Sequence, residues 1–122
     1  MQLQVGNESL SIVLEELKIK ESSFIARIAA KKLRCSQVAI VVGDTVHLHN
    51  TSKNEFLSNL PWVRHEKVHL EQFRRYGTIN FVMRYLVESI RKGYRNNRFE
   101  IEARMAEISE ATQFRRSETS VQ

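Results

Sequence analysis

Residues 61–76 combine a metal-ligand spacing with the periodicity of a helix, and they constrain the chain more than any other stretch. Within them, residues 65–69 read His-Glu-Lys-Val-His, an H-E-x-x-H motif. Residues four apart on a helix lie one above the other, so His65 and His69 can reach a single metal ion. Glu66 is then placed to take a proton from the water that attacks a substrate.

Projecting this stretch at about 100° per residue divides it into two faces. One face holds the aromatic residues together with the motif: Trp62, His65, Glu66, His69, Gln72, Phe73 and Tyr76. The opposite face is mainly basic: Arg64, Lys67, Glu71, Arg74 and Arg75. Pro61 suits the first helical turn and Gly77 suits the end. Ionisable groups on a face that should be buried are costly unless they are paired or bind a metal. This favours a zinc ion, and a hydrogen-bonded histidine pair with a glutamate partner is the alternative.

The length and composition place the chain in a broad class. A chain of 122 residues is long enough for one domain with a single core. The net charge of +5 allows an acidic partner, but Lys and Arg occur in every segment, which is typical of a solvated surface. A nucleic-acid-binding domain would also leave the inward-facing His65, Glu66 and His69 unexplained. The single Cys35 excludes an internal disulfide and fits a reducing compartment. Because no apolar run resembles a signal peptide or a membrane span, we expect a cytoplasmic protein without a membrane partner.

The two ends of the chain carry the weakest patterns. The apolar positions of residues 1–21 fit a helix or a strand, and we expect a variable lead-in there. Ser22 or Ser23 can cap a helix that runs to about Arg34. Residues 112–122 are polar and lack periodicity, which predicts a flexible tail.

A β-hairpin is expected next. Residues 37–42 are β-branched and nearly all apolar, which predicts a buried strand. Gly43-Asp44 is a turn signal, and residues 45–49 alternate between apolar and polar. Thr45, His47 and His49 share one face of the second strand. Two histidines at i and i+2 can chelate a metal, and the alternative is the polar outer face of an edge strand.

The remaining segments predict helices. Ser52 and Glu55 are spaced like a capping box for a short helical turn. After the histidine-bearing helix, Thr78 can cap a helix over residues 79–92, whose apolar stripe predicts core packing. A final helix is expected over about residues 97–111.

The final helix matters because a zinc site of this kind needs a third protein ligand. Glu100 and Glu102 compete for this role, and helical projection does not separate them. Glu107 shares the side of Glu100 and can support a ligand from behind. The alternative is a solvated acidic face.

The order of helix, hairpin, H-E-x-x-H helix, connecting helix and Glu-bearing helix resembles the gluzincin-type zincins, in particular the small bacterial domains called minigluzincins. The resemblance covers roughly residues 22–111 and implies a minimal zincin-like α+β fold. In gluzincins the third ligand often lies in a Glu-x-x-Ala-Asp setting. Residues 99–104 read Phe-Glu-Ile-Glu-Ala-Arg, so the resemblance selects Glu100 over Glu102, with Arg104 in place of the Asp. Residues 65–72 are also similar to the H-E-x-x-H-x-x-Q form of related bacterial proteins.

The resemblance implies a small zinc-dependent metallopeptidase acting on a peptide or protein substrate. His65, His69 and Glu100 would hold Zn²⁺, and Glu66 would pass a proton from the attacking water to the leaving amine. In zincins the edge strand beside the metal cleft pairs with an extended peptide, a role that falls here to residues 45–49.

A group besides zinc is also needed to stabilise the oxyanion. The candidates are Tyr94 or Tyr76, or one of His47 and His49, and the sequence does not choose among them. The alternative function is a catalytically silent zinc-binding module with a binding or structural role. Oligomeric state does not follow from the sequence.

Overall fold

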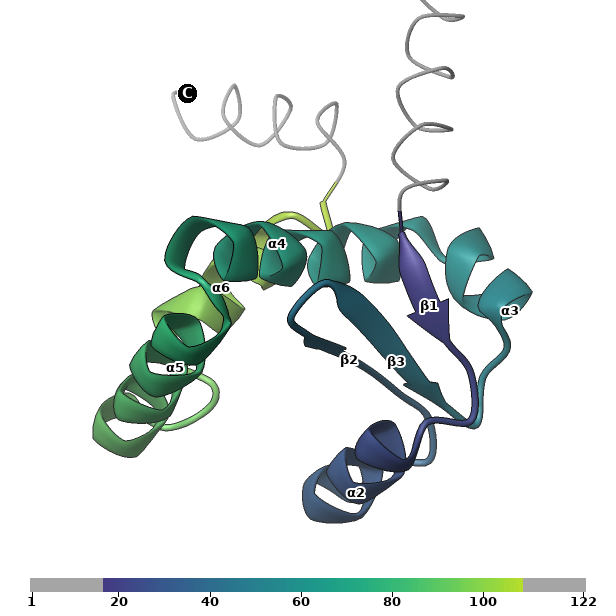
Figure 1. The fold of residues 1–122 in the computed structure, drawn as a ribbon, viewed down its shortest axis with the longest axis horizontal. Coiled ribbons are helices and arrows are strands. Elements are labelled where there is room, and N and C mark those ends of the chain that lie inside the picture. The colour runs from purple at the N-terminus through teal and green to yellow at the C-terminus, as the bar shows by residue number, and fades with distance from the viewer. Residues whose placement is uncertain (1–16, 109–122) are drawn as a thin grey trace, which may run out of the picture.

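A three-stranded sheet lies between helices in the computed structural model, which describes residues 17–108 (Figure 1). The elements are β1 (Lys18–Lys20), α2 (Phe24–Leu33), β2 (Val38–Val42), β3 (Thr45–His49), α3 (Lys53–Ser58), α4 (Leu60–Tyr76), α5 (Thr78–Lys92) and α6 (Arg98–Met105). The fold is therefore α+β, as expected. The tail predicted for residues 112–122 and most of the lead-in lie outside the described residues.

The predicted hairpin is confirmed. β2 and β3 pair antiparallel with Val41 opposite Val46, and Gly43 occupies the turn at a φ of 65°, where a side chain would be strained. β1 pairs parallel with the other side of β3, which gives the strand order β1-β3-β2. The expectation that residues 45–49 form an edge strand is wrong, because β3 is the central strand. Within the described residues, the edge strands are β1 and β2.

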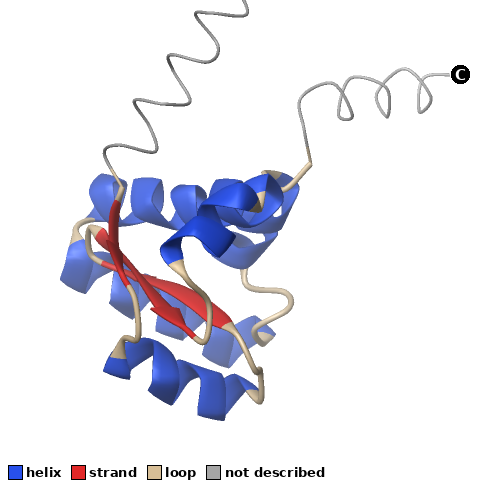
Figure 2. Cartoon of the chain, turned by 90° about the vertical axis from the view of Figure 1, so that its right-hand side faces the viewer, coloured by secondary structure: helices blue, strands red, loops and turns tan. Residues whose placement is uncertain are grey.

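Helices cover both faces of the sheet (Figure 2). α4 and α3 cover the face from which Val46 and Leu48 project, and both of these side chains are fully buried. α2 covers the other face through Ala26 and Ala30, whose small side chains allow close approach. Alternate residues of a strand point to opposite faces, so Thr45, His47 and His49 face the α2 side. The core on the α4 side consists of Val41, Val46, Leu48, Phe56, Val63, Leu70, Phe73, Phe81 and Phe99.

The helix boundaries follow local capping. Ser23 caps α2 by accepting a hydrogen bond from the Ala26 amide, and Ser52 and Glu55 form the expected capping box at α3. α5 begins after Gly77 without a side-chain cap, so the prediction of a Thr78 cap is wrong. α6 ends at Met105, earlier than the sequence indicates.

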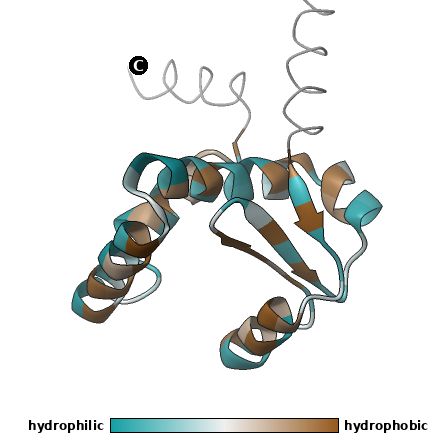
Figure 3. Ribbon diagram, viewed as in Figure 1, coloured by the Kyte–Doolittle hydropathy of each residue, from teal (hydrophilic) through white to brown (hydrophobic). Residues whose placement is uncertain are grey.

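α5 is not a core helix, although its apolar stripe predicts core packing. Only Phe81 is buried on it, whereas Ile79 and Ile90 are more than 80% exposed. Four further apolar side chains of α5 are exposed: Val82, Met83, Leu86 and Val87. Figure 3 shows apolar residues along both α5 and α2. No helix among the described residues is long and apolar enough to cross a membrane.

Candidate metal centre

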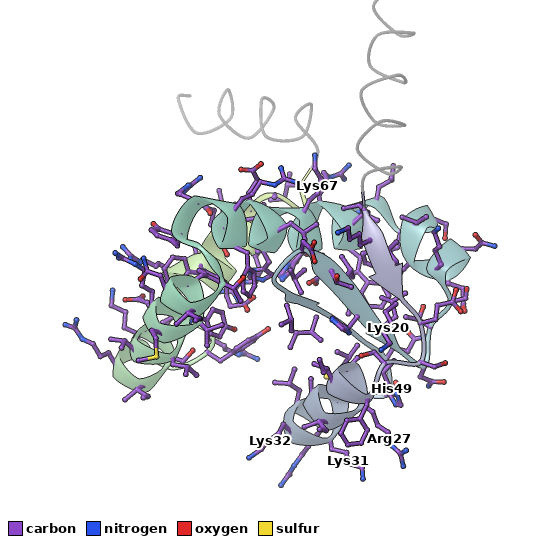
Figure 4. All side chains as sticks on the ribbon, in the orientation of Figure 1. Lys20, Arg27, Lys31, Lys32, His49 and Lys67 are labelled. Carbon is purple, nitrogen blue, oxygen red and sulfur yellow. The ribbon has the colours of Figure 1, made fainter. Side chains whose placement is uncertain are left out.

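The H-E-x-x-H motif lies in the middle of α4, on the face turned toward the sheet and α6. Asn59 accepts a hydrogen bond from the Trp62 amide at the start of this helix, and Pro61 occupies the first turn. Glu66 and His69 are buried at 5% and 8% exposure. Lys67, between them in sequence, projects from the opposite side of the helix, away from the sheet (Figure 4). The predicted inward position of Glu66 and His69 and the outward position of Lys67 are therefore confirmed.

α6 brings the third acidic group to the two histidines. Asn97 is fully buried and caps α6 by accepting from the Phe99 amide at 2.8 Å. Its amide nitrogen donates to the Tyr85 carbonyl oxygen and to Ser89 on α5. These bonds fix the start of α6 against α5, and they place Glu100 one turn later with 4% exposure.

His65, His69 and Glu100 form a cluster of metal-ligating atoms in the described part of the chain. Glu100 Oε1 lies 3.3 Å from His65 Nε2 and 3.3 Å from His69 Nε2. The three potential ligand atoms are all within 4.8 Å of one another. Zinc holds nitrogen and oxygen at about 2.0–2.2 Å in tetrahedral sites, so two of its ligand atoms are about 3.4 Å apart. The two observed distances match that spacing.

The far side of each imidazole is held by an acceptor. His65 Nδ1 lies 2.6 Å from Glu107 Oε2, and His69 Nδ1 lies 2.9 Å from Gln72 Oε1. The amide nitrogen of Gln72 donates to the Phe99 carbonyl oxygen and to Glu102, which turns its amide oxygen toward His69. Both Nδ1 atoms therefore carry a proton and donate it. In the neutral rings, the two Nε2 lone pairs then point at the Glu100 carboxylate.

Three converging acceptors repel one another unless a cation or extra protons lie between them. Burial lowers the pKa values of His65 and His69, but hydrogen bonds to Glu100 and to Glu107 or Gln72 outweigh it and raise both. Burial alone would raise the pKa of Glu100, but the hydrogen bonds from the two histidines hold it well below its ordinary value. In the absence of a metal, protons on the two imidazole rings compensate the negative charge of the Glu100 carboxylate. A divalent cation would compensate the same charge while the rings stay neutral.

Glu66 lies beside this cluster and is separated from His65 Nε2 by 4.0 Å. Burial raises its pKa to about 8, although the nearby His69 opposes the shift. A buried carboxyl group with a raised pKa next to potential metal ligands has the properties of a general base or acid. The structure therefore places Glu66 next to the predicted ligands.

Two tyrosine side chains lie next to Glu100 of the cluster. Tyr85 on α5 donates to Glu100 Oε2 at 2.5 Å, and burial raises the pKa of its hydroxyl. Tyr94 lies beside Glu100, and burial raises its pKa to about 12, so it keeps its proton at neutral pH. Tyr76 instead stacks on Phe81 in the core. Of the two tyrosines that the sequence offered for the oxyanion, only Tyr94 is near the centre.

Other predicted residues have different positions. Glu102 bonds Gln72 rather than the histidines, and Glu107 supports His65 as the sequence allowed. His47 is buried under α2, where its Nδ1 is hydrogen-bonded to Ser23 Oγ at 2.7 Å. Neither His47 nor His49 belongs to the cluster of metal-ligating atoms found in the described residues. Thr45, on the same strand face, also points away from the centre.

Sequence reasoning missed three contributors. Tyr85 belongs to no motif in the sequence, and its signal is a position four residues after the buried Phe81. Gln72 belongs to the H-E-x-x-H-x-x-Q pattern, which predicts no role for it. Helical projection places Arg64 on the solvent face, yet it donates to the carbonyl oxygens of Ala106 and Glu107, which holds the end of α6 near His65.

Comparisons with protein-family models, with curated proteins and with solved structures found no match to this chain. The functional assignment therefore depends on the geometry of the centre.

Proposed function

We propose that the protein is a small zinc-dependent metallopeptidase with a zincin-like arrangement of its metal centre. The main support is the convergence of two Nε2 lone pairs and one Glu100 oxygen at the spacing of tetrahedral zinc ligands. Hydrogen-bonded partners behind both histidines strengthen the proposal, because structural support of this kind is typical of metal-binding imidazoles. Three protein ligands leave a fourth position for water or substrate.

Zinc bound by His65, His69 and Glu100 would act as a Lewis acid that polarises the substrate carbonyl and lowers the pKa of the attacking water. A cation held by these ligands would favour the ionised form of Glu66 despite its burial. Glu66 would then accept the proton of that water and deliver it to the leaving amine, and its buried position would keep bulk water from competing for this proton. Tyr94 keeps its hydroxyl proton at neutral pH and is available to donate to the oxyanion. Tyr85 donates to Glu100 Oε2 and so orients Oε1 toward the two histidines.

The place for a peptide is the free edge of β2, not β3. β2 is an edge strand in the described residues, and all of its residues line the same groove as the metal centre. An extended peptide that adds to this edge would gain main-chain hydrogen bonds and pass next to His65 and Glu66. The peptide-binding role that the resemblance gave to residues 45–49 therefore moves, in this proposal, to Val38–Val42.

Zinc content and hydrolysis measured on the same variants test the proposal. Wild type should bind about one zinc per chain, which His69→Ala and Glu100→Ala should each lose. Glu66→Gln should keep the zinc and lose peptide hydrolysis, measured with a library of internally quenched peptides. A wild-type chain that stays free of zinc after dialysis against the metal would overturn the proposal.

A protein that binds zinc but cleaves no peptide in the library would instead be a catalytically silent zinc-binding module. The Glu66→Gln variant separates the two functions, because zinc binding without hydrolysis in both wild type and variant identifies the silent module.

A further inference from the structure

A groove of about 420 Å³ lies between α2, β2 and α5, and the candidate metal ligands line part of it. Its walls are apolar: Ala29 and Leu33 from α2, Ile40 and Val42 from β2, and Val82 and Leu86 from α5. Apart from the metal centre, Lys32 is the one charged side chain among its described lining residues. Both helical walls are exposed to solvent. Leu33 is 48% exposed and Leu86 is 50% exposed. Exposed apolar side chains that gather around a concave site mark a binding surface.

The two faces of β2 show which ligand fits between these walls. Val38 belongs to the apolar cluster under α2, whereas Val41 belongs to the core under α4. Side chains of a strand paired with β2 would alternate in the same way. One set would point toward Leu33 on α2, and the other would point toward the α4 side, where the metal centre lies. Val82 and Leu86 of α5 add a further apolar wall to the groove, so large apolar side chains on the added strand would be buried there.

We infer that the ligand of this groove is a polypeptide segment with large apolar side chains. The inference rests on the proposed function, because it takes the metal centre as the point where that segment is cut. It goes further by naming the substrate class and by assigning specificity to the facing walls, Leu33 and Leu86.

Binding of a fluorescein-labelled peptide to the full chain tests the inference without requiring hydrolysis. The probe peptide carries leucine, valine and phenylalanine at consecutive positions, and its control carries serine and glutamine there. Fluorescence anisotropy is measured on zinc-free and on zinc-loaded protein. The zinc-free protein should bind the apolar peptide at least about tenfold more tightly than the polar control, because only the apolar side chains fill the groove.

Matched substitutions locate the binding. Leu86 and Val87 are 50% and 49% exposed on the same helix, but only Leu86 lines the groove. Leu86→Glu should weaken peptide binding about tenfold or more, since a carboxylate would be desolvated there, and Val87→Glu should retain it. Leu33→Glu and Ile28→Glu form a second pair on α2, both from positions that are 48% exposed. Thermal unfolding of all four variants checks that each remains folded.

Equal effects within both pairs, or no preference for the apolar peptide, would overturn the inference. So would a wild-type dimer that Leu86→Glu dissociates, because the groove would then hold a second copy of the chain. Strong protection from hydrogen exchange, without peptide, of those β2 amides that do not bond β3 would overturn it too, by showing that the chain fills its own groove. If the protein binds the apolar peptide but never hydrolyses peptides, the proposed peptidase function is wrong and the apolar ligand of the groove is retained. If it hydrolyses peptides without preferring the apolar one, the peptidase function is retained and the inference about the groove is wrong.

Discussion

The side-chain amide of Gln72 fixes the ring of His69. Gln72 is fully buried, and its amide nitrogen donates to Glu102 at 2.7 Å and to the Phe99 carbonyl oxygen at 3.1 Å. Its oxygen can then only accept from His69 Nδ1, which leaves Nε2 with a lone pair directed at Glu100. A single side chain therefore links α4 to α6 and sets the tautomer of a metal ligand.

Replacing Gln72 with leucine should weaken zinc binding about 10- to 100-fold, because His69 loses the acceptor that orients its ring. The free energy of unfolding of the zinc-free protein should also fall by about 1–3 kcal/mol, since the Phe99 carbonyl loses its amide donor. Competition with a chromophoric chelator measures the affinity. Glu102→Gln is the matched control, because a glutamine there still accepts from Gln72. Unchanged zinc affinity in Gln72→Leu would contradict this role.

The sequence predicts α4 well because every signal for this helix lies within the helix itself. The spacing of His65 and His69, the aromatic residues on the same face and Pro61 at the start all lie within one local segment. Glu107 could be proposed for the same reason, since periodicity predicts it on the side of Glu100, although α6 ends two residues before it. Local patterns of this kind can be read from one sequence without knowing which distant segments pack together.

The pairing of distant segments could not be predicted. β1 has three residues, too few for a clear alternating pattern, and its parallel contact with β3 depends on a crossover through α2. Without β1, the sequence leaves β3 on an edge. Periodicity also shows that α5 is amphipathic, but it does not show whether other parts of the chain cover the apolar stripe.

Phe81 should carry most of the packing energy of α5. Its ring lies 4.6 Å from that of Phe73 and 5.0 Å from that of Phe99, measured between centroids, and it is 3% exposed. Phe81→Ala should lower the free energy of unfolding by about 3–5 kcal/mol, measured by urea denaturation. Ile90→Ala on the same helix should change it by less than about 0.5 kcal/mol, because Ile90 is 83% exposed. Equal losses in both variants would show that the apolar stripe is covered in solution.

Tyr85 and Tyr94 should have separable roles. Tyr85→Phe removes the donor to Glu100 Oε2, so zinc affinity should fall about tenfold or more. Tyr94→Phe should change zinc affinity less than Tyr85→Phe does and reduce kcat by about 10²-fold or more, as expected for loss of an oxyanion donor. Chelator competition and steady-state hydrolysis of the same peptide distinguish the two effects. A Tyr94→Phe variant with full kcat would exclude Tyr94 from the reaction.

His47 should make the stability of the domain depend on pH. Burial lowers the pKa of His47 in the folded protein, and the nearby charge of Lys20 adds to this effect. The unfolded chain therefore binds the proton more readily, and the free energy of unfolding should decrease as pH falls below about 6.5, the ordinary histidine pKa. The loss should level off below the lowered pKa of the folded state.

Urea denaturation of zinc-free protein at pH 7.5 and pH 5.5 measures this dependence. His47→Asn keeps an amide that can donate to or accept from the Ser23 hydroxyl but cannot take up a proton, so it should show a smaller decrease than wild type. The metal-centre histidines also titrate in this range, but they are present in both proteins and cancel in the comparison. His49→Asn on the same strand face is the control and should behave like wild type. If the free energy of unfolding of His47→Asn falls as much as that of wild type between the two pH values, protonation of His47 does not cause the pH dependence.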